Sequence, residues 1–82
     1  MIQVLFFARL RDQLGCDSLT LESVDGDNVT KLRERLVAEH PDWREPLSAP
    51  GILFAVNQSL VKSGHSVNDG DEVAFMPPVT GG

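Results

Sequence analysis

The sequence predicts an α+β fold in which one main helix lies across a mixed β-sheet. The two most apolar segments that read as strands, residues 2–7 and 72–76, stand at opposite ends of the chain and are typical of central strands. Between them, one long segment, residues 29–40, repeats its apolar side chains at helical spacing. Because a helix with a single apolar stripe must bury it, we expect this helix to cover one face of the sheet.

The first part of the chain predicts a strand, a short helix and a second strand. Residues 2–7 are rich in β-branched and aromatic side chains. In residues 8–14, Leu10 and Leu14 stand four apart, which predicts one or two helical turns ending at Gly15. Residues 18–22 alternate polar and apolar side chains, as a half-buried strand does. If the two strands pair, they do so across an unusually long connection.

The main helix is expected to follow the turn and cap residues 25–28. Charged side chains cover one side of it, and its apolar stripe comprises Val29, Leu32, Leu36 and Val37. The helix should end near His40, because Pro41 disfavours helical geometry in the residue before it.

The second half of the chain predicts short strands joined by turns. Residues 42–51 are expected to be irregular, because Pro46 and Pro50 interrupt regular elements. A strand at 52–56 should turn tightly at Asn57 and Gln58 into a strand at 59–61, since Asn tolerates positive φ. Further turns at 63–65 and 68–71 precede the final strand, 72–76. With the first and last strands adjacent in the middle, this is the β-grasp arrangement: a domain at 1–76 and an extended tail at 77–82.

Size and charge exclude several classes of function. A chain of 82 residues makes one small domain, so a deep catalytic cleft is not expected and catalysis would occur in a partner. The net charge of −5 argues against binding to nucleic acid or to an anionic membrane surface. A single cysteine cannot form an internal disulfide, and the apolar run at 4–8 is too short to cross a membrane. We therefore expect a cytoplasmic protein.

Metal and nucleophile chemistry find no support in the spacing of side chains. Cys16, His40 and His65 have no neighbours at ligand spacing, and Asp69 and Asp71 are more simply turn formers. No glycine-rich phosphate loop is present, because the glycines before the terminal pair are scattered singly through turns. Without a basic activator beside it in the sequence, Cys16 is interpreted as a small spacer rather than a reactive thiol.

The C-terminal tail, residues 77–82, has the sequence PPVTGG. Two prolines favour a stiff, extended path that holds the arm away from the body. Two glycines accept any backbone angle and fit a passage too narrow for a side chain. A tail of this kind suits delivery of its own carboxylate into another protein's active site, although a frayed terminus also fits these residues.

Alternation in the last strand predicts an exposed apolar patch near the base of the tail. Neighbouring side chains of a strand point to opposite faces, and only one face can meet the helix. Such patches often mark interfaces, and the candidates here are Phe7, Leu60, Phe75 and Met76. Core packing is the alternative for each residue taken alone. Arg11 is expected to be solvated or to contact acidic groups of a partner.

Four segments of the chain resemble the small subunit of molybdopterin synthase, a family of sulfur carriers with a ubiquitin-like β-grasp fold. The segments are VLFFA at 4–8, VNQ at 56–58, DGDEVAF at 69–75 and PPVTGG at 77–82. The resemblance extends over essentially the whole chain, and its terminal motif is specific.

The resemblance implies a chemistry centred on Gly82. A ubiquitin-activating-like adenylyltransferase would use ATP to adenylate the Gly82 carboxylate, with no cofactor bound permanently and no metal. A persulfide donor enzyme would supply sulfur, giving a thiocarboxylate. The chain would then donate this sulfur to cyclic pyranopterin monophosphate within the large synthase subunit, which holds the active site. Two small subunits on a dimer of large ones, a heterotetramer, are expected.

The resemblance also implies roles for individual residues. Gly81 and Thr80 would thread the tail into the partner. The partner interface would include Phe7, Leu60, Phe75, Met76 and, as a further candidate, Arg11. The sequence departs from the family at Met76, where family members often have a second aromatic residue. Because methionine is flexible and apolar, contact should persist with altered packing.

Three alternatives remain open at this point. A thiamine-pathway sulfur carrier also ends in Gly-Gly on this fold, although such chains are typically shorter and lack the PPVT lead-in. A ubiquitin-like protein modifier would instead join Gly82 to lysines through isopeptide bonds. A bare β-grasp binding module would use neither reaction. The sequence alone does not separate an adenylate destined for sulfur from one destined for an amine.

Overall fold

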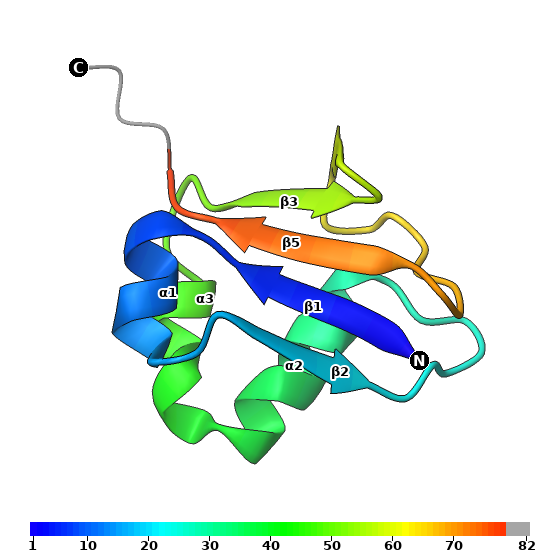
Figure 1. Ribbon diagram of the computed structural model, residues 1–82, viewed down its shortest axis with the longest axis horizontal. Helices are drawn as coiled ribbons and strands as arrows, with labels where there is room; N and C mark the ends of the chain where they lie inside the picture. Colours follow the sequence, from blue (N-terminus) through cyan, green and yellow to red (C-terminus); the bar gives the residue numbers. More distant parts are fainter. Residues whose placement is uncertain (79–82) are drawn as a thin grey trace.

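Five strands form one mixed sheet, and helix α2 lies across one of its faces (Figure 1). The computed structural model describes residues 1–78. The elements in chain order are β1 (Ile2–Phe6), α1 (Ala8–Leu14), β2 (Ser18–Leu21), α2 (Val29–Glu39), the 3₁₀ helix η1 (Pro41–Trp43), α3 (Arg44–Leu47), β3 (Leu53–Val56), β4 (Ser59–Val61) and β5 (Glu72–Met76).

The strand order β2-β1-β5-β3-β4 places the first and last strands of the chain side by side in the middle of the sheet. β1 and β5 run parallel, with Val4 opposite Val73, and the other pairings are antiparallel. β1 and β2 pair although α1 lies between them in the sequence, so the predicted long connection between these strands is confirmed. This topology, with one main helix across the sheet, confirms the predicted β-grasp fold.

Local signals in the sequence account for most element boundaries. α1 ends at Gly15, which adopts the left-handed conformation (φ 67°) and donates its N–H to the carbonyl of Arg11. α2 begins at Asn28, whose side chain accepts the N–H of Lys31 at 2.8 Å. Asn57 and Gln58 both have positive φ (50° and 71°), so the predicted tight turn between β3 and β4 is confirmed.

The segment between α2 and β3 is where the sequence-based prediction is wrong. Residues 42–51 were expected to be irregular, yet Pro41–Trp43 forms a 3₁₀ helix and Arg44–Leu47 a short α-helix. Pro46 is compatible with α3 because the N–H groups of a first helical turn have no intrahelical partner to lose. The two short helices bury Trp43 and Leu47 in the core.

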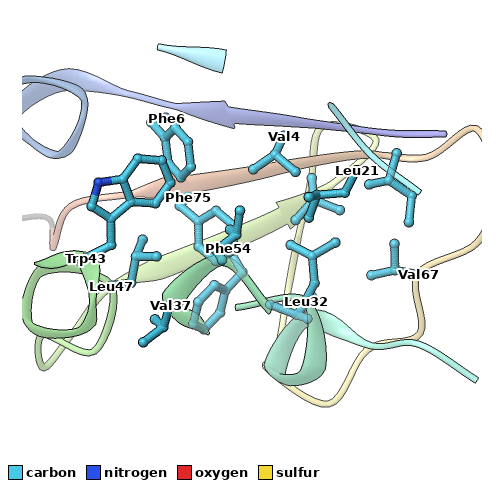
Figure 2. Packing of buried hydrophobic residues seen from close by; sticks show 14 of the residues in the cluster. Val4, Phe6, Leu21, Leu32, Val37, Trp43, Leu47, Phe54, Val67 and Phe75 are labelled. Carbon is cyan, nitrogen blue, oxygen red and sulfur yellow. The ribbon is translucent and has the colours of Figure 1, made fainter. Parts of the chain in front are cut away.

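The hydrophobic core lies between the sheet and the helices (Figure 2). An aromatic group occupies one end of it: the ring of Phe6 lies edge-on to Trp43 at 5.3 Å and stacks with Phe75 at 5.8 Å between centroids. Phe54 meets Phe75 edge-on at 5.7 Å. Aromatic pairs at these distances add to the free energy gained by burial. Phe75, on the central strand β5, therefore packs against aromatic residues of both neighbouring strands, β1 and β3.

Truncation of Phe75 is expected to destabilise the fold severely. The side chain is fully buried, so Phe75→Ala should lower the free energy of unfolding by about 3–5 kcal/mol, against a total of about 5–15 kcal/mol for a typical domain. Urea unfolding followed by Trp43 fluorescence measures the change. Leu60→Ala, at an exposed site, is the control and should shift the free energy by about 0.5 kcal/mol or less. Equal effects of the two substitutions would contradict this placement of Phe75.

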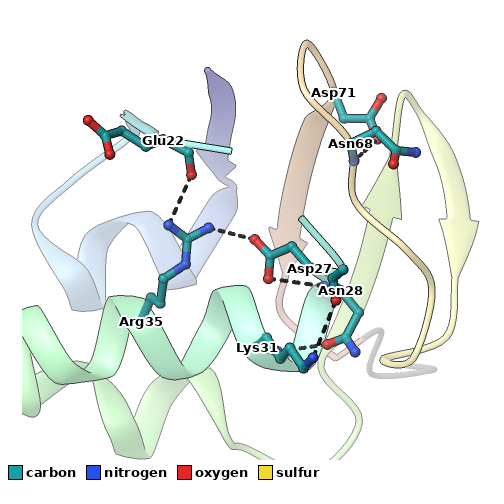
Figure 3. Close-up of polar contacts among 8 residues, drawn as sticks. Glu22, Asp27, Asn28, Lys31, Arg35, Asn68 and Asp71 are labelled. Carbon is teal, nitrogen blue, oxygen red and sulfur yellow. Dashed lines mark hydrogen bonds and ion pairs between the residues drawn. The ribbon is translucent and has the colours of Figure 1, made fainter. Parts of the chain in front are cut away.

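An ion pair between Arg35 of α2 and the buried Asp27 helps to hold the helix against the end of β2 (Figure 3). Asp27 accepts a hydrogen bond from Arg35 at 2.6 Å, and Arg35 also donates to the carbonyl of Glu22 at 3.0 Å. The second carboxylate oxygen of Asp27 accepts the N–H of Asn28 at 3.0 Å. Because the Asp27 side chain is almost fully buried, removing Arg35 would leave an unpaired charge in the interior.

Candidate functional site

The face of the sheet opposite α2 carries the candidate site. Along β5, Val73 and Phe75 are fully buried toward the helix, whereas Ala74 and Met76 alternate onto the opposite face. The same alternation in β1 buries Val4 and directs Leu5 away from the core. The face opposite α2 is thus formed by the strand residues whose side chains point away from the core.

Eight residues of this face line a shallow depression of about 540 Å³, which we call the apolar face: Leu5, Phe7, Ala55, Gln58, Leu60, Glu72, Ala74 and Met76. Two of its large apolar side chains stand out in solvent, with Leu60 68% exposed and Phe7 43% exposed. Exposed apolar side chains gathered on one face of a small domain are typical of interaction sites.

The structure brings together three of the predicted interface residues. Phe7, Leu60 and Met76 all line the apolar face, although they come from the end of β1, from β4 and from β5. Phe75 does not lie there: its side chain is fully buried and packs on Phe6 and Phe54. Because adjacent strand residues point to opposite faces, the side chain of Met76 is available to a partner and that of Phe75 is not. Phe75 is a core residue, and its placement at the interface is corrected.

Arg11 lies elsewhere on the surface. It belongs to α1 and lines a separate depression with Asp12, Gly15, Cys16 and Asp17. Arg11 is not among the residues of the apolar face. A contact of Arg11 with a partner would therefore involve a second part of the surface.

Sequence reasoning missed several residues of the apolar face, among them Leu5, Ala55 and Ala74. Leu5 stands between the buried residues Val4 and Phe6, so strict alternation already directs it outward. This alternation was hard to recognise in the sequence because β1 carries apolar side chains on both faces. Small residues such as Ala55 and Ala74 leave room between the larger side chains.

A polar network holds the β3–β4 hairpin, which carries Leu60, against the start of β5. The Asn57 side chain donates to Asp71 at 3.0 Å and accepts the N–H of Glu72 at 3.0 Å. Asp71 also accepts the N–H of Asn68 at 2.8 Å (Figure 3). These bonds join the turn of the hairpin to residues 68–72, so they fix where Leu60 stands relative to the rest of the apolar face.

Two carboxylates near this network titrate below their usual range. The N–H of Asn68 and, secondarily, the Asn57 side chain lower the pKa of Asp71, and the N-terminal ammonium of Met1 lowers the pKa of Asp69. A carboxylate whose pKa is lower in the folded chain contributes stability above its unfolded pKa. That contribution is lost as the pH falls through the folded pKa.

We therefore expect the free energy of unfolding to decrease as the pH falls below about 4, the ordinary range of an aspartate. Asp71→Asn should remove the share of this dependence that Asp71 contributes and make the decrease shallower. Urea unfolding between pH 2.5 and pH 7 measures both slopes. Identical slopes for the wild-type chain and Asp71→Asn would show that the folded state does not favour the ionised Asp71.

The base of the tail lies against the body of the domain. Pro77 and Pro78, directly after β5, are both half-buried. Packing therefore continues two residues beyond the predicted domain boundary at Met76. The predicted tail residues Thr80, Gly81 and Gly82 lie outside the described residues.

Other chemistries have no counterpart within residues 1–78. No group of three or more His, Cys, Asp or Glu side chains in this range could hold a metal ion. In the same range, no helix is long and apolar enough to cross a membrane. Cys16 is a partly exposed free thiol whose Sγ donates to the carbonyl of Ser18 at 3.3 Å.

Comparison with known proteins places these features in a family. Residues 4–82 match the model of the ThiS family. The chain is 48% identical to the molybdopterin synthase sulfur carrier subunit of Escherichia coli (strain K12), over the full length of both. It is 42% identical to the subunit of that name from Haemophilus influenzae, again over the full length of both.

Two solved structures share the fold. SAMP1 from Haloferax volcanii superposes with a TM-score of 0.85 at 24% identity, covering 99% of this chain and 98% of the other. Subunits 1 and 2 of the molybdopterin-converting factor from Helicobacter pylori were solved as a complex. The matching chain of that complex has a TM-score of 0.65 at 22% identity, covering 99% and 97%. At these identities the two likenesses establish the ubiquitin-like β-grasp fold alone. The family match and the full-length relatives together show that the chain belongs to the ThiS family and that molybdopterin synthase sulfur carrier subunits are among its relatives.

Proposed function

We propose that this chain is the sulfur carrier subunit of a molybdopterin synthase and that Gly82 carries the sulfur. The observation that carries the proposal is the 48% identity to a molybdopterin synthase sulfur carrier subunit over the full length of both chains. The family match supports it as well, because it extends to residue 82 and so includes the terminal glycines.

The proposed chemistry begins with activation of the Gly82 carboxylate. A terminal carboxylate has a pKa of about 3.5, so it is ionised at neutral pH and is a poor acyl acceptor. Its attack on the α-phosphate of ATP, in an adenylyltransferase partner, gives an acyl adenylate and releases pyrophosphate. A persulfide sulfur then attacks the carbonyl and AMP leaves. Reduction of the resulting acyl disulfide by a thiol gives the thiocarboxylate.

The apolar face is the proposed docking surface for the large synthase subunit. Met76 lies on that face and is the last residue of β5, so a partner bound there sits beside the start of the tail. The thiocarboxylate, a soft nucleophile, would then reach cyclic pyranopterin monophosphate in the large subunit's active site. Attachment to a carrier replaces random collision by binding, which is the advantage of positioning a reactant.

The adenylyltransferase is proposed to use the same surface. Both partners must receive the same tail, and the apolar face is the exposed apolar surface next to its base in the described part of the chain. Binding of the two partners would then be mutually exclusive, so the carrier would alternate between them. The cytoplasmic location expected from the single cysteine stays a prediction.

Reconstitution of the synthase tests the proposal. The chain is first converted to the thiocarboxylate and is then mixed with purified large subunit and cyclic pyranopterin monophosphate. We expect molybdopterin to form with two carriers consumed per product, because each dithiolene holds two sulfurs. Transfer of the sulfur to a thiazole precursor instead would identify a thiamine-pathway carrier. Conjugates with lysines would identify a protein modifier.

A further inference from the structure

Gly51 lies beside Pro78 at the base of the tail, with little room for a side chain between them. Gly51 has a φ of 81°, and a Cβ placed on it would lie 3.1 Å from the Cβ of Pro78 and 3.4 Å from its Cγ. Carbon atoms favour separations of about 3.5–4.0 Å, so a Cβ at position 51 would require the Pro78 ring to move by a few tenths of an ångström. The other described positive-φ glycines, Gly15, Gly26 and Gly70, have nothing within 4 Å of such a Cβ.

The surroundings of Pro78 come from two other parts of the chain. Pro77 and Pro78 line a small depression of about 230 Å³ together with Arg9 and Gln13 of α1 and Ala49. The turn that presents Gly51 is closed by a hydrogen bond of 3.3 Å from the N–H of Ile52 to the carbonyl of Ala49. The start of the tail therefore borders both α1 and the loop that precedes β3.

The start of α1 is held to the strand that leads into the tail. The N–H of Phe7 donates to the carbonyl of Phe75 at 3.2 Å. This backbone hydrogen bond thus connects the start of α1 to the end of β5. Since proline fixes its own φ, the position of the Pro78 ring is coupled to the position of the Pro78 backbone.

We propose that Gly51 is a positioning residue for the base of the tail: by leaving room for the Pro78 ring, it sets where Pro78 stands on the domain. This inference rests on the proposed function, in which the carboxylate of Gly82 must enter a partner's active site. Gly82 follows Pro78 by only four residues, so a displacement of Pro78 moves the point from which the reacting carboxylate is delivered. A misplacement of about 1 Å can lower a reaction rate about a hundredfold.

The test compares Gly51→Ala with Gly26→Ala. Both substitutions force an alanine into the left-handed region, at φ of 81° and 74°, so both introduce similar backbone strain. Only the alanine at position 51 meets Pro78. Both variants are assayed as full-length chains, at a temperature where Trp43 fluorescence shows each to be folded.

The readout is sulfur transfer from the thiocarboxylated chain to cyclic pyranopterin monophosphate in the large subunit. Gly51→Ala is expected to lower kcat about tenfold or more with KM nearly unchanged, because the apolar face is intact. Gly26→Ala should leave both constants within about twofold of the wild-type values. A kcat for Gly51→Ala equal to that of Gly26→Ala would overturn the proposal.

A second substitution tests whether the contact with Pro78 causes the loss of kcat in Gly51→Ala. Pro78→Gly removes the ring atoms that a Cβ at position 51 would meet. In that background, Gly51→Ala should lower kcat no more than Gly26→Ala does, since coupled residues show non-additive effects. If Gly51→Ala still lowers kcat tenfold in the Pro78→Gly background, contact with the Pro78 ring is not the reason for the loss.

A measurement without any partner separates this inference from the proposed function. A nitroxide is attached at Thr80→Cys in a Cys16→Ser chain, and broadening of backbone amide NMR signals reports which part of the surface the label approaches. The pattern should change in Gly51→Ala and stay as in the wild type in Gly26→Ala. The same pattern in all three chains would overturn the positioning role. Failure of the wild-type chain to transfer sulfur would overturn the proposed function alone.

Discussion

Deletion of Gly81 and Gly82 is expected to abolish molybdopterin formation while leaving the folded domain and its partner binding intact. The deletion removes the proposed acceptor of sulfur but none of the residues of the core or of the apolar face. Thiocarboxylate should be undetectable, and product formation in the reconstituted synthase should fall to background. The assay is molybdopterin formed per carrier chain.

The truncated chain provides its own control. Its free energy of unfolding should match that of the full chain within about 0.5 kcal/mol, as for changes away from packed features. Its affinity for the large subunit reports whether docking survives. Molybdopterin formation by the truncated chain at the full-length rate would show that Gly82 does not carry the sulfur.

Leu60→Asp is expected to weaken binding to the large subunit at least about thirtyfold, or about 2 kcal/mol. Leu60 is the most exposed large apolar side chain in the described part of the chain and lies on the apolar face. In a complex, a carboxylate there would be buried without a partner, which is costly. Isothermal titration calorimetry with the purified large subunit measures the change in Kd.

Val24→Asp is the matched control for Leu60→Asp. Val24 is also a large apolar residue exposed to solvent, at 51%, but it is not among the residues of the apolar face. Its substitution introduces the same charge and should leave Kd within about twofold of the wild-type value. If the two substitutions weaken binding equally, the loss reflects net charge and the apolar face is not the docking surface.

Much of the fold could be predicted because local patterns and topology agreed. The two most apolar strand segments became the adjacent central strands, and Gly15, Asn28 and Asn57 ended or began elements as their backbone preferences indicate. The short helices containing Trp43 and Leu47 were missed because Pro46 was taken as a breaker. Proline breaks a helix only where it removes a hydrogen bond, which a single-turn helix does not lose.

The site could be predicted only in part. Alternation in the last strand predicted an exposed apolar patch, and three of its four candidates, Phe7, Leu60 and Met76, line the apolar face. Phe75 was misplaced because an apolar residue in a central strand fits both faces, and only the three-dimensional position of the helix decides between them. The close approach of Gly51 to Pro78 joins residues 27 positions apart, so no local pattern could indicate it.

The central claim, that Gly82 carries sulfur, is tested most directly by the intact mass of this chain. The chain is incubated with the adenylyltransferase, ATP and a persulfide donor, and the large subunit with cyclic pyranopterin monophosphate is then added. We expect a mass increase of about 16 Da, the exchange of one oxygen for sulfur, located at the C-terminal residue by fragmentation and lost again during molybdopterin formation. An unchanged mass, or heavier conjugates released only by cleavage of isopeptide bonds, would contradict it.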